Sequence, residues 1–144
     1  MLIGQYEGTV SEKKQVAFPK KFRALLGNTI VITKGFDGNL VIVSEKGWET
    51  LLEGTARIPF TNKTARETQR YLLGNASVVE LDNKGRFVLP EYLREYAGIS
   101  KEIVFAGINR FVEVWDKRKW NEAQKVLADN IVSITEKLNG QEEK

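Results

Sequence analysis

The chain has 144 residues, with 22 Lys or Arg against 19 Asp or Glu and a formal net charge of +3. That length allows one well-cored domain or two small interlocked ones. The sequence contains neither His nor Cys, so it lacks a side chain that titrates near neutral pH, a thiol nucleophile and the usual zinc ligands. This composition argues against common hydrolase and metalloenzyme sites, predicts no cofactor, and fits a reducing cytoplasm.

Charge is unevenly placed along the chain. Residues 10–23 hold five Lys or Arg against the single Glu12, and a local basic patch matters more than total charge for contact with a polyanion. Residues 1–6 are too short and too lightly apolar for a signal peptide, and no window reaches the length of about 18 apolar residues expected of a membrane span. We therefore expect a cytoplasmic protein with no membrane partner.

The first half of the sequence predicts, in order, strands over residues 2–10 and 15–18, a helix over 20–26, strands over 30–32 and 40–43, and a helix from 44 to 52. Pro19 suits the start of the short helix because its missing N–H needs no partner there. Gly27 suits the end of that helix. Ser44 can cap the last helix of this half.

Residues 61–73 are polar and rich in helix formers, which predicts a connecting helix. The second half predicts strands over 76–82 and 86–89, a helix over 90–97, strands over 102–106 and 111–115, a long helix over 117–138 and a frayed tail at 140–144. The long helix carries one apolar stripe: Trp120, Ala123, Leu127, Ile131, Ile134 and Leu138. This stripe can pack on the chain's own sheet or against another subunit.

The two halves are copies of one unit, about 71 residues apart. Residues 12–27 align with 83–98, sharing Lys, Pro, Arg and Gly at matched positions. The register continues, since Gly35 meets Gly107 and Trp48 meets Trp120, and we expect both tryptophans to anchor the core. A duplicated unit predicts a pseudo-symmetric fold that presents the same loop twice.

The repeat also suggests the division of the chain. We expect residues 1–54 to form the first repeat, 55–74 a helical connector, 75–119 the second repeat, and 120–144 the C-terminal helix and tail. The two repeats are expected to fold as one unit.

Each copy places cations on its first turn. Lys13 and Lys14 in one copy and Lys84 in the other can neutralise phosphates, although lysine is also common on solvated turns. Arg86 can reach a base edge while Asp82 holds it by a charge-assisted hydrogen bond. The alternative is a surface ion pair that only steadies the turn.

Other residues of the same region have structural alternatives too. Gly85 is expected to serve a backbone conformation that other residues resist. Lys20 either contacts phosphate or keeps the short helix soluble. Arg23 and Arg94 recur at one helical position, where they either flank the loop or cap the helix end.

The run at 81–90, followed by Arg94 and by residues 111–116, resembles the MraZ family of bacterial transcriptional regulators. Gly4 with Tyr6, and the repeat of Pro19 and Arg23, extend this likeness over nearly the whole chain. The resemblance implies an α+β fold, in which two SpoVT/AbrB-type repeats form a swapped-hairpin barrel. It also implies that subunits assemble into rings, and that a loop with a D-x-x-x-R pattern binds direct repeats in double-stranded DNA upstream of cell-division and cell-wall genes.

The first copy departs from this family pattern. Ser11 and Gln15 stand where the family usually has Asp and Arg, and Lys14 replaces the glycine. Positive charge is kept at the turn, but the planar guanidinium that pairs with guanine is missing there.

The sequence therefore predicts a nucleoid-associated, homo-oligomeric DNA-binding regulator with no catalytic residues, bound metal or small-molecule substrate. The alternative is an antitoxin-like module or protein-interaction scaffold of the same fold, with incidental basic loops. RNA binding is a third possibility, although the sequence shows no aromatic platform for stacked bases.

Overall fold

The computed structural model describes residues 1–53 and 59–142. Part of the expected connector, at 55–58, and the last two residues of the expected tail lie outside the described residues. Within the described ranges, no helix is both long enough and apolar enough to cross a membrane.

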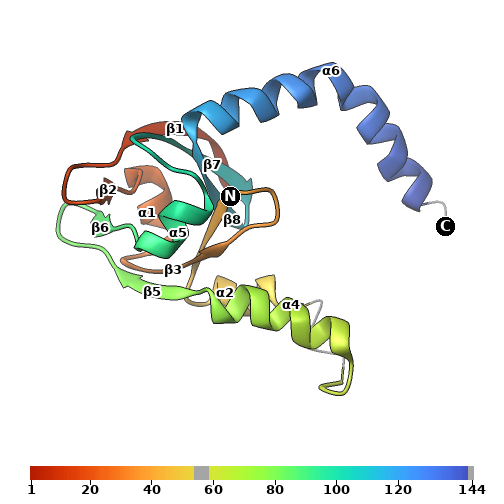
Figure 1. Cartoon of the computed structure of the whole chain (residues 1–144), viewed down its shortest axis with the longest axis horizontal. Helices are drawn as coiled ribbons and strands as arrows, with labels where there is room; N and C mark the ends of the chain where they lie inside the picture. The colour runs from red at the N-terminus through yellow and green to blue at the C-terminus, as the bar shows by residue number, and fades with distance from the viewer. Residues whose placement is uncertain (54–58, 143–144) are drawn as a thin grey trace.

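The fold mixes helices and antiparallel strands (Figure 1). The elements in chain order are β1 (Leu2–Thr9), β2 (Gln15–Ala17), α1 (Lys20–Leu26), β3 (Thr29–Lys34), β4 (Leu40–Ser44), α2 (Gly47–Leu51), α4 (Lys63–Gly74), β5 (Ser77–Glu80), β6 (Arg86–Val88), α5 (Glu91–Tyr96), β7 (Glu102–Asn109), β8 (Phe111–Asp116) and α6 (Lys117–Glu142). These bounds confirm the predicted order of elements in both halves. The prediction of a frayed tail was wrong for residues 140–142, because α6 continues through them.

The strands of the described chain form a six-stranded antiparallel sheet in the order β1-β7-β8-β4-β3-β5, and a separate two-stranded ribbon of β2 and β6. The two halves are interleaved in both. Strand β1 pairs with β7, β5 pairs with β3, and β2 pairs with β6. Because each of these pairs joins one half to the other, neither half closes its own hydrogen-bonding edges.

The main core lies between the sheet and the short helices α1 and α5. Phe22 of α1 and Leu93 of α5 are 2% and 0% exposed, at matched positions of the two copies. Burying each of these side chains stabilises the fold by about 2 kcal/mol. Phe18 meets Phe105 edge to face, with ring centroids 5.6 Å apart.

The two matched tryptophans differ, and the prediction that both anchor the core was wrong for Trp120. Trp48 is half-buried and packs beside a smaller cluster on β3 and β4. Trp120, also half-buried, donates from Nε1 to Gln5 Oε1 at 2.8 Å and meets the buried Trp115 ring edge to face. Both lie on helices outside the sheet, where an indole N–H can keep a polar partner.

Helix α4 is attached to the sheet by hydrogen bonds from side chains. Thr33, fully buried on β3, donates from Oγ1 to the Leu72 carbonyl at 2.6 Å. The Tyr71 hydroxyl donates to the Gly35 carbonyl and lies 2.7 Å from the Tyr96 hydroxyl. Burial, followed by the hydrogen bond with Tyr96, raises the pKa of Tyr71 above its usual value of 10.

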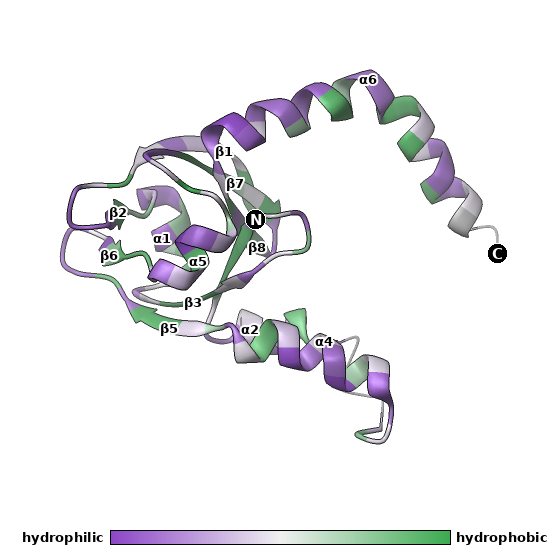
Figure 2. Cartoon of the chain, viewed as in Figure 1, coloured by the Kyte–Doolittle hydropathy of each residue, from purple (hydrophilic) through white to green (hydrophobic). Residues whose placement is uncertain are grey.

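Helix α6 projects from the body of the protein, and Figure 2 shows apolar residues along its outer part. Ala123 is half-buried near its first turns. Farther along the stripe, the exposed fractions are 44% for Leu127, 51% for Ile131, 40% for Ile134 and 56% for Leu138. The stripe therefore does not pack on the chain's own sheet beyond the first turns.

Candidate functional site

Antiparallel pairing of β2 with β6 joins the two repeats and sets the first turn of each repeat at opposite ends of one short ribbon. We call residues 11–14 loop 1 and residues 82–85 loop 2. Val16 pairs with Phe87, and both side chains are buried in the core. The two loops lie at the end of the protein away from α4 and α6 (Figure 1).

The two loops share one backbone geometry. In loop 1, the Ser11 amide donates to the Gln15 carbonyl at 3.0 Å, and the Lys14 amide donates to the Ser11 carbonyl at 2.9 Å. In loop 2, Asp82 and Gly85 make the equivalent bonds, each at 2.9 Å. Lys14 and Gly85 both adopt a positive φ, 63° and 76°, so Gly85 serves the backbone conformation that the sequence predicted.

Each loop is also attached to the opposite repeat. The Phe18 amide donates to the Gly85 carbonyl at 2.8 Å, and the Leu89 amide donates to the Lys14 carbonyl at 2.9 Å. These reciprocal bonds satisfy the carbonyl of each positive-φ residue. They fix the position of one loop relative to the other.

In loop 2 a single carboxylate organises the turn. Asp82 Oδ1 accepts the backbone amides of Lys84 at 2.9 Å and of Arg86 at 2.8 Å, and Oδ2 accepts Arg86 Nε at 2.9 Å. The pKa of Asp82 lies below its usual value of 3.8, chiefly because the carboxylate accepts the Arg86 amide. The hydrogen bonds from the Arg86 side chain and the Lys84 amide lower this pKa further. The bond through Nε leaves the two terminal nitrogens of Arg86 available within the described part of the chain.

Arg23 reaches loop 2 from the other repeat. A Cβ added to the buried Gly85 would overlap the Arg23 guanidinium and lie 3.1 Å from Cζ. The end of α1 is closed by the backbone, because the Gly27 amide donates to the Arg23 carbonyl at 2.8 Å. The Arg23 side chain thus flanks the loop, as one of the two sequence interpretations required.

Arg94 holds the equivalent position on α5. Its carbonyl accepts the Ile99 amide at 3.0 Å, so the backbone closes this helix end as well. Its side chain is half-buried, and Nε has no hydrogen-bond partner among the described residues. Direct accessibility is therefore lower for Arg94 than for the lysines of the loops.

The remaining cations of the predicted site are exposed. Lys13, Lys14, Lys84 and Arg86 lie on or beside the two loops, and Lys20 begins α1. Glu12 and Asp82 are the acidic residues of the loops, so this end of the protein keeps a positive charge. Flexible ammonium groups on exposed turns can attract phosphate without fixing its direction.

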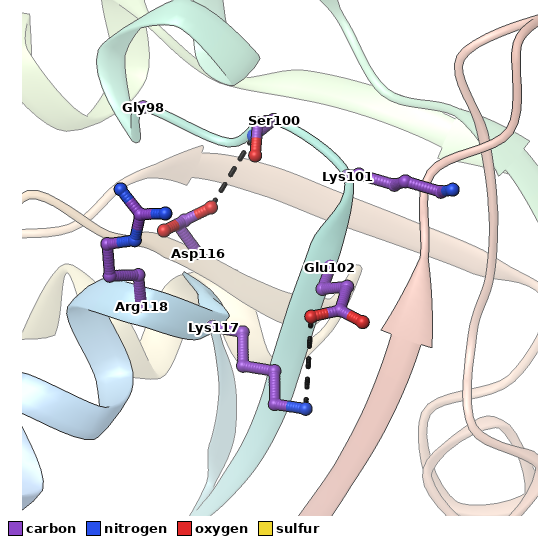
Figure 3. Close-up of a pocket in the computed structure, with 7 residues that line it drawn as sticks. All are labelled: Gly98, Ser100, Lys101, Glu102, Asp116, Lys117 and Arg118. Atoms are coloured by element: carbon purple, nitrogen blue, oxygen red, sulfur yellow. Dashed lines mark hydrogen bonds and ion pairs between the residues drawn. The ribbon is translucent and has the colours of Figure 1, made fainter.

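A polar hollow at the start of α6 is lined by several charged side chains (Figure 3). Its carboxylates have partners, since Asp116 Oδ1 accepts the Ser100 amide at 3.5 Å and Glu102 lies 3.9 Å from Lys117 Nζ. Asp116 Oδ2 also accepts the Lys119 amide at 3.4 Å. These contacts attach the start of α6 to the sheet.

A family model described as "MraZ protein, putative antitoxin-like" matches the chain twice, over residues 1–71 and 72–139. The chain belongs to the MraZ family. The double match coincides with the internal repeat, and its two parts each contain one of the loops.

Curated MraZ relatives align with nearly the whole chain. A protein of Clostridium beijerinckii is 42% identical over 96% of this chain and 97% of its own length. A protein of Caldanaerobacter subterraneus subsp. tengcongensis is 40% identical over the same shares, and one of Moorella thermoacetica is 36% identical over 96% of each chain. All three are named "Transcriptional regulator MraZ".

One contact of this MraZ chain was missed at the sequence level. Ser11 Oγ accepts the Gln15 amide at 3.1 Å, as Asp82 Oδ1 accepts the Arg86 amide. The signal was present, because Ser and Asp side chains both cap turns through a nearby backbone amide. The approach of Arg23 to Gly85 had no such signal, since it depends on how the two repeats are interleaved.

Proposed function

We propose that this protein is a DNA-binding transcription regulator that contacts the phosphate backbone through loop 1 and loop 2. The observation that carries the proposal is that two cation-bearing loops, joined through the β2–β6 ribbon, lie at one end of the protein (Figure 1). The names of the relatives support the regulatory role. The contact residues are Lys13, Lys14, Lys20, Arg23, Lys84, Arg86 and Arg94, with Asp82 and Gly85 shaping loop 2.

Contact with phosphate predicts that the affinity for DNA depends on the salt concentration. Each phosphate neutralised by Lys or Arg releases condensed counterions, so affinity falls steeply as salt is added. Fluorescence anisotropy with a labelled duplex, across a salt series, measures this slope. We expect Lys84→Ala to weaken binding and to make the slope shallower by about 1, and we expect Arg86→Ala to weaken binding as well.

Lys46→Ala is the matched control, because Lys46 is an exposed cation beside α2 and not on the loops. Its affinity and salt slope should equal those of the unmodified chain. Binding that does not respond to salt, or that responds equally to Lys46→Ala, would contradict the proposed interface.

The proposal includes one folded unit, a swapped-hairpin barrel formed by repeats at 1–54 and 75–119, joined by the connector at 55–74 and followed by the helix and tail at 120–144. The pairing of β1 with β7, β3 with β5 and β2 with β6 supports this arrangement. Chemical unfolding followed by hydrogen exchange tests it. Both repeats should open in one transition, and separate transitions would contradict the barrel.

We further propose that the protein acts as a homo-oligomer, as a ring on repeated sites upstream of cell-division and cell-wall genes. One loop pair offers few contacts, and linked subunits raise the affinity through effective concentration. The exposed stripe on α6 supports the intersubunit contact. Mass photometry should show oligomers, and a single species at the monomer mass of 16.4 kDa would contradict the ring.

A scaffold or antitoxin-like role is the second candidate, and the description of the family as antitoxin-like favours it. In that case the partner is another protein and the basic loops are incidental. DNA binding that is unaffected by both salt and Arg86→Ala would favour this candidate over the regulator.

A further inference from the structure

The two loops have the same backbone and share one lysine, Lys13 matched with Lys84, but they differ at the positions of Asp82, Gly85 and Arg86. Loop 2 carries a carboxylate, Asp82, whose two oxygens serve different partners. Oδ1 holds the turn, and Oδ2 holds Arg86 Nε at 2.9 Å. The ion pair is exposed, with relative side-chain accessibilities of 45% for Arg86 and 38% for Asp82.

In loop 1 a side-chain oxygen also holds the turn, but no side-chain oxygen orients a neighbouring side chain. Ser11 has one side-chain oxygen, and it accepts the Gln15 amide at 3.1 Å. No second oxygen remains to orient a neighbouring side chain, and Gln15 carries no charge. The turn of loop 1 is therefore preserved without the oriented guanidinium.

The cation nearest the positive-φ residue also comes from a different source in each loop. In loop 2 the Arg23 guanidinium covers the buried Gly85. In loop 1 the positive-φ residue is itself an exposed lysine, Lys14. Lysine presents a compact charge on a flexible stem, which suits phosphate, whereas a held arginine can pair with guanine O6 and N7 through two parallel bonds.

We propose that the two loops divide their roles on double-stranded DNA: loop 2 reads a base edge through Arg86 held by Asp82, and loop 1 binds phosphate alone through Lys13 and Lys14. This inference rests on the proposed function and specifies which residues determine its sequence preference. Each subunit then specifies one short block of base pairs, although it touches the duplex with two loops.

The experiment begins with selection of bound duplexes from a pool with a randomised core, using the full chain. The selected duplex and a duplex with the same core shuffled are then the two probes. The ratio of their affinities measures discrimination, and the salt slope on the shuffled duplex measures phosphate contact. Thermal unfolding of each variant confirms that it is folded.

Arg86→Lys keeps the charge and removes the planar fork. Discrimination should fall by about 5- to 100-fold, because one good bidentate pair is worth that much against the wrong base. Because the charge is kept, affinity for the shuffled duplex should fall by a smaller factor than affinity for the selected duplex. An unchanged discrimination ratio would overturn the role assigned to loop 2.

The double variant Lys13→Gln with Lys14→Gln removes the charge from loop 1. Affinity for both duplexes should fall by the same factor, and the salt slope should become shallower by about 2. A fall in discrimination as large as that of Arg86→Lys would overturn the division of roles.

Ser11→Asp with Gln15→Arg rebuilds the arrangement of loop 2 on loop 1. Selection with this variant should recover duplexes with a longer specified stretch than those recovered by the unmodified chain. If the unmodified chain already selects two blocks of equal strength, the division is wrong while the proposed function stands. If it binds no duplex in a salt-dependent manner, the proposed function itself fails.

Discussion

Replacement of Gly85 by alanine tests the most closely packed point of the loop pair. At φ 76°, an L-residue is strained by about 1–2 kcal/mol relative to the right-handed region. The new methyl group would also overlap the Arg23 guanidinium. Because that guanidinium ends a flexible side chain, its displacement adds little, and we expect a total loss of stability of about 1–2 kcal/mol.

Thermal unfolding measures this loss. For a chain of this length, about 1–2 kcal/mol lowers the Tm by roughly 3–7 °C. Lys14→Ala is the matched control, since Lys14 already holds a Cβ at φ 63° and is exposed. Its Tm should change by no more than about 2 °C.

A double-mutant cycle with Arg23→Ala separates the two causes of the Gly85→Ala effect. With Arg23 shortened, only the backbone strain should remain, so Gly85→Ala should cost less in that background. The reasoning is refuted if Gly85→Ala is as stable as the unmodified chain. An identical cost with and without Arg23 would leave the backbone strain as the sole cause of the loss.

Three further predictions concern other parts of the fold. Gly107→Ala should lower the free energy of unfolding, measured in urea, by about 3 kcal/mol or more. Its Cβ would lie 2.5 Å from the Ile3 backbone nitrogen, which cannot move without separating β1 from β7. A small loss of stability would contradict the register of these two strands. Tyr71→Phe should cost about 1 kcal/mol by removing the hydrogen bond to Gly35. Since folding raises the pKa of Tyr71, its contribution is full below pH 10 and declines above it, so the variant should lose stability less steeply in alkaline melts; an equal decline would contradict this assignment. Since folding lowers the pKa of Asp82, the contribution of this carboxylate to stability should be full above pH 3.8 and be lost only as the pH falls below that value. The test compares the Tm of the unmodified chain with that of Asp82→Asn across pH. The prediction is contradicted if this difference in Tm already shrinks between pH 7 and pH 5.

The order of elements was predictable because both copies carry strong local signals. Apolar runs predicted β3 and β4, and the matched prolines predicted the starts of α1 and α5, each of which begins one residue after its proline. The pairing of β2 with β6 could be expected only through the family resemblance, because strand pairing over a long sequence separation has no local signature. The predicted helix ended at residue 138, whereas α6 continues through Glu142.

The candidate site was predictable in its residues and less so in its contacts. Lys and Arg on matched turns indicated the loops, and Asp82 with Arg86 at a separation of four residues indicated their ion pair. The position of Trp120 was misjudged, because an indole on an amphipathic helix can lie at the boundary of a sheet as well as in a core. Its partner, Gln5, lies 115 residues earlier in the chain.

The reciprocal bonds from the Phe18 and Leu89 amides have a consequence for how such a protein can diversify. They hold the two turns by main-chain atoms, which every residue type supplies. Side chains at the tips can therefore be exchanged without altering the shape on which they are displayed. Under the proposed function, the side chains of one loop can change their sequence preference while the other loop keeps its phosphate contacts. Ser11 with Gln15 differs from Asp82 with Arg86 in this way on the same backbone.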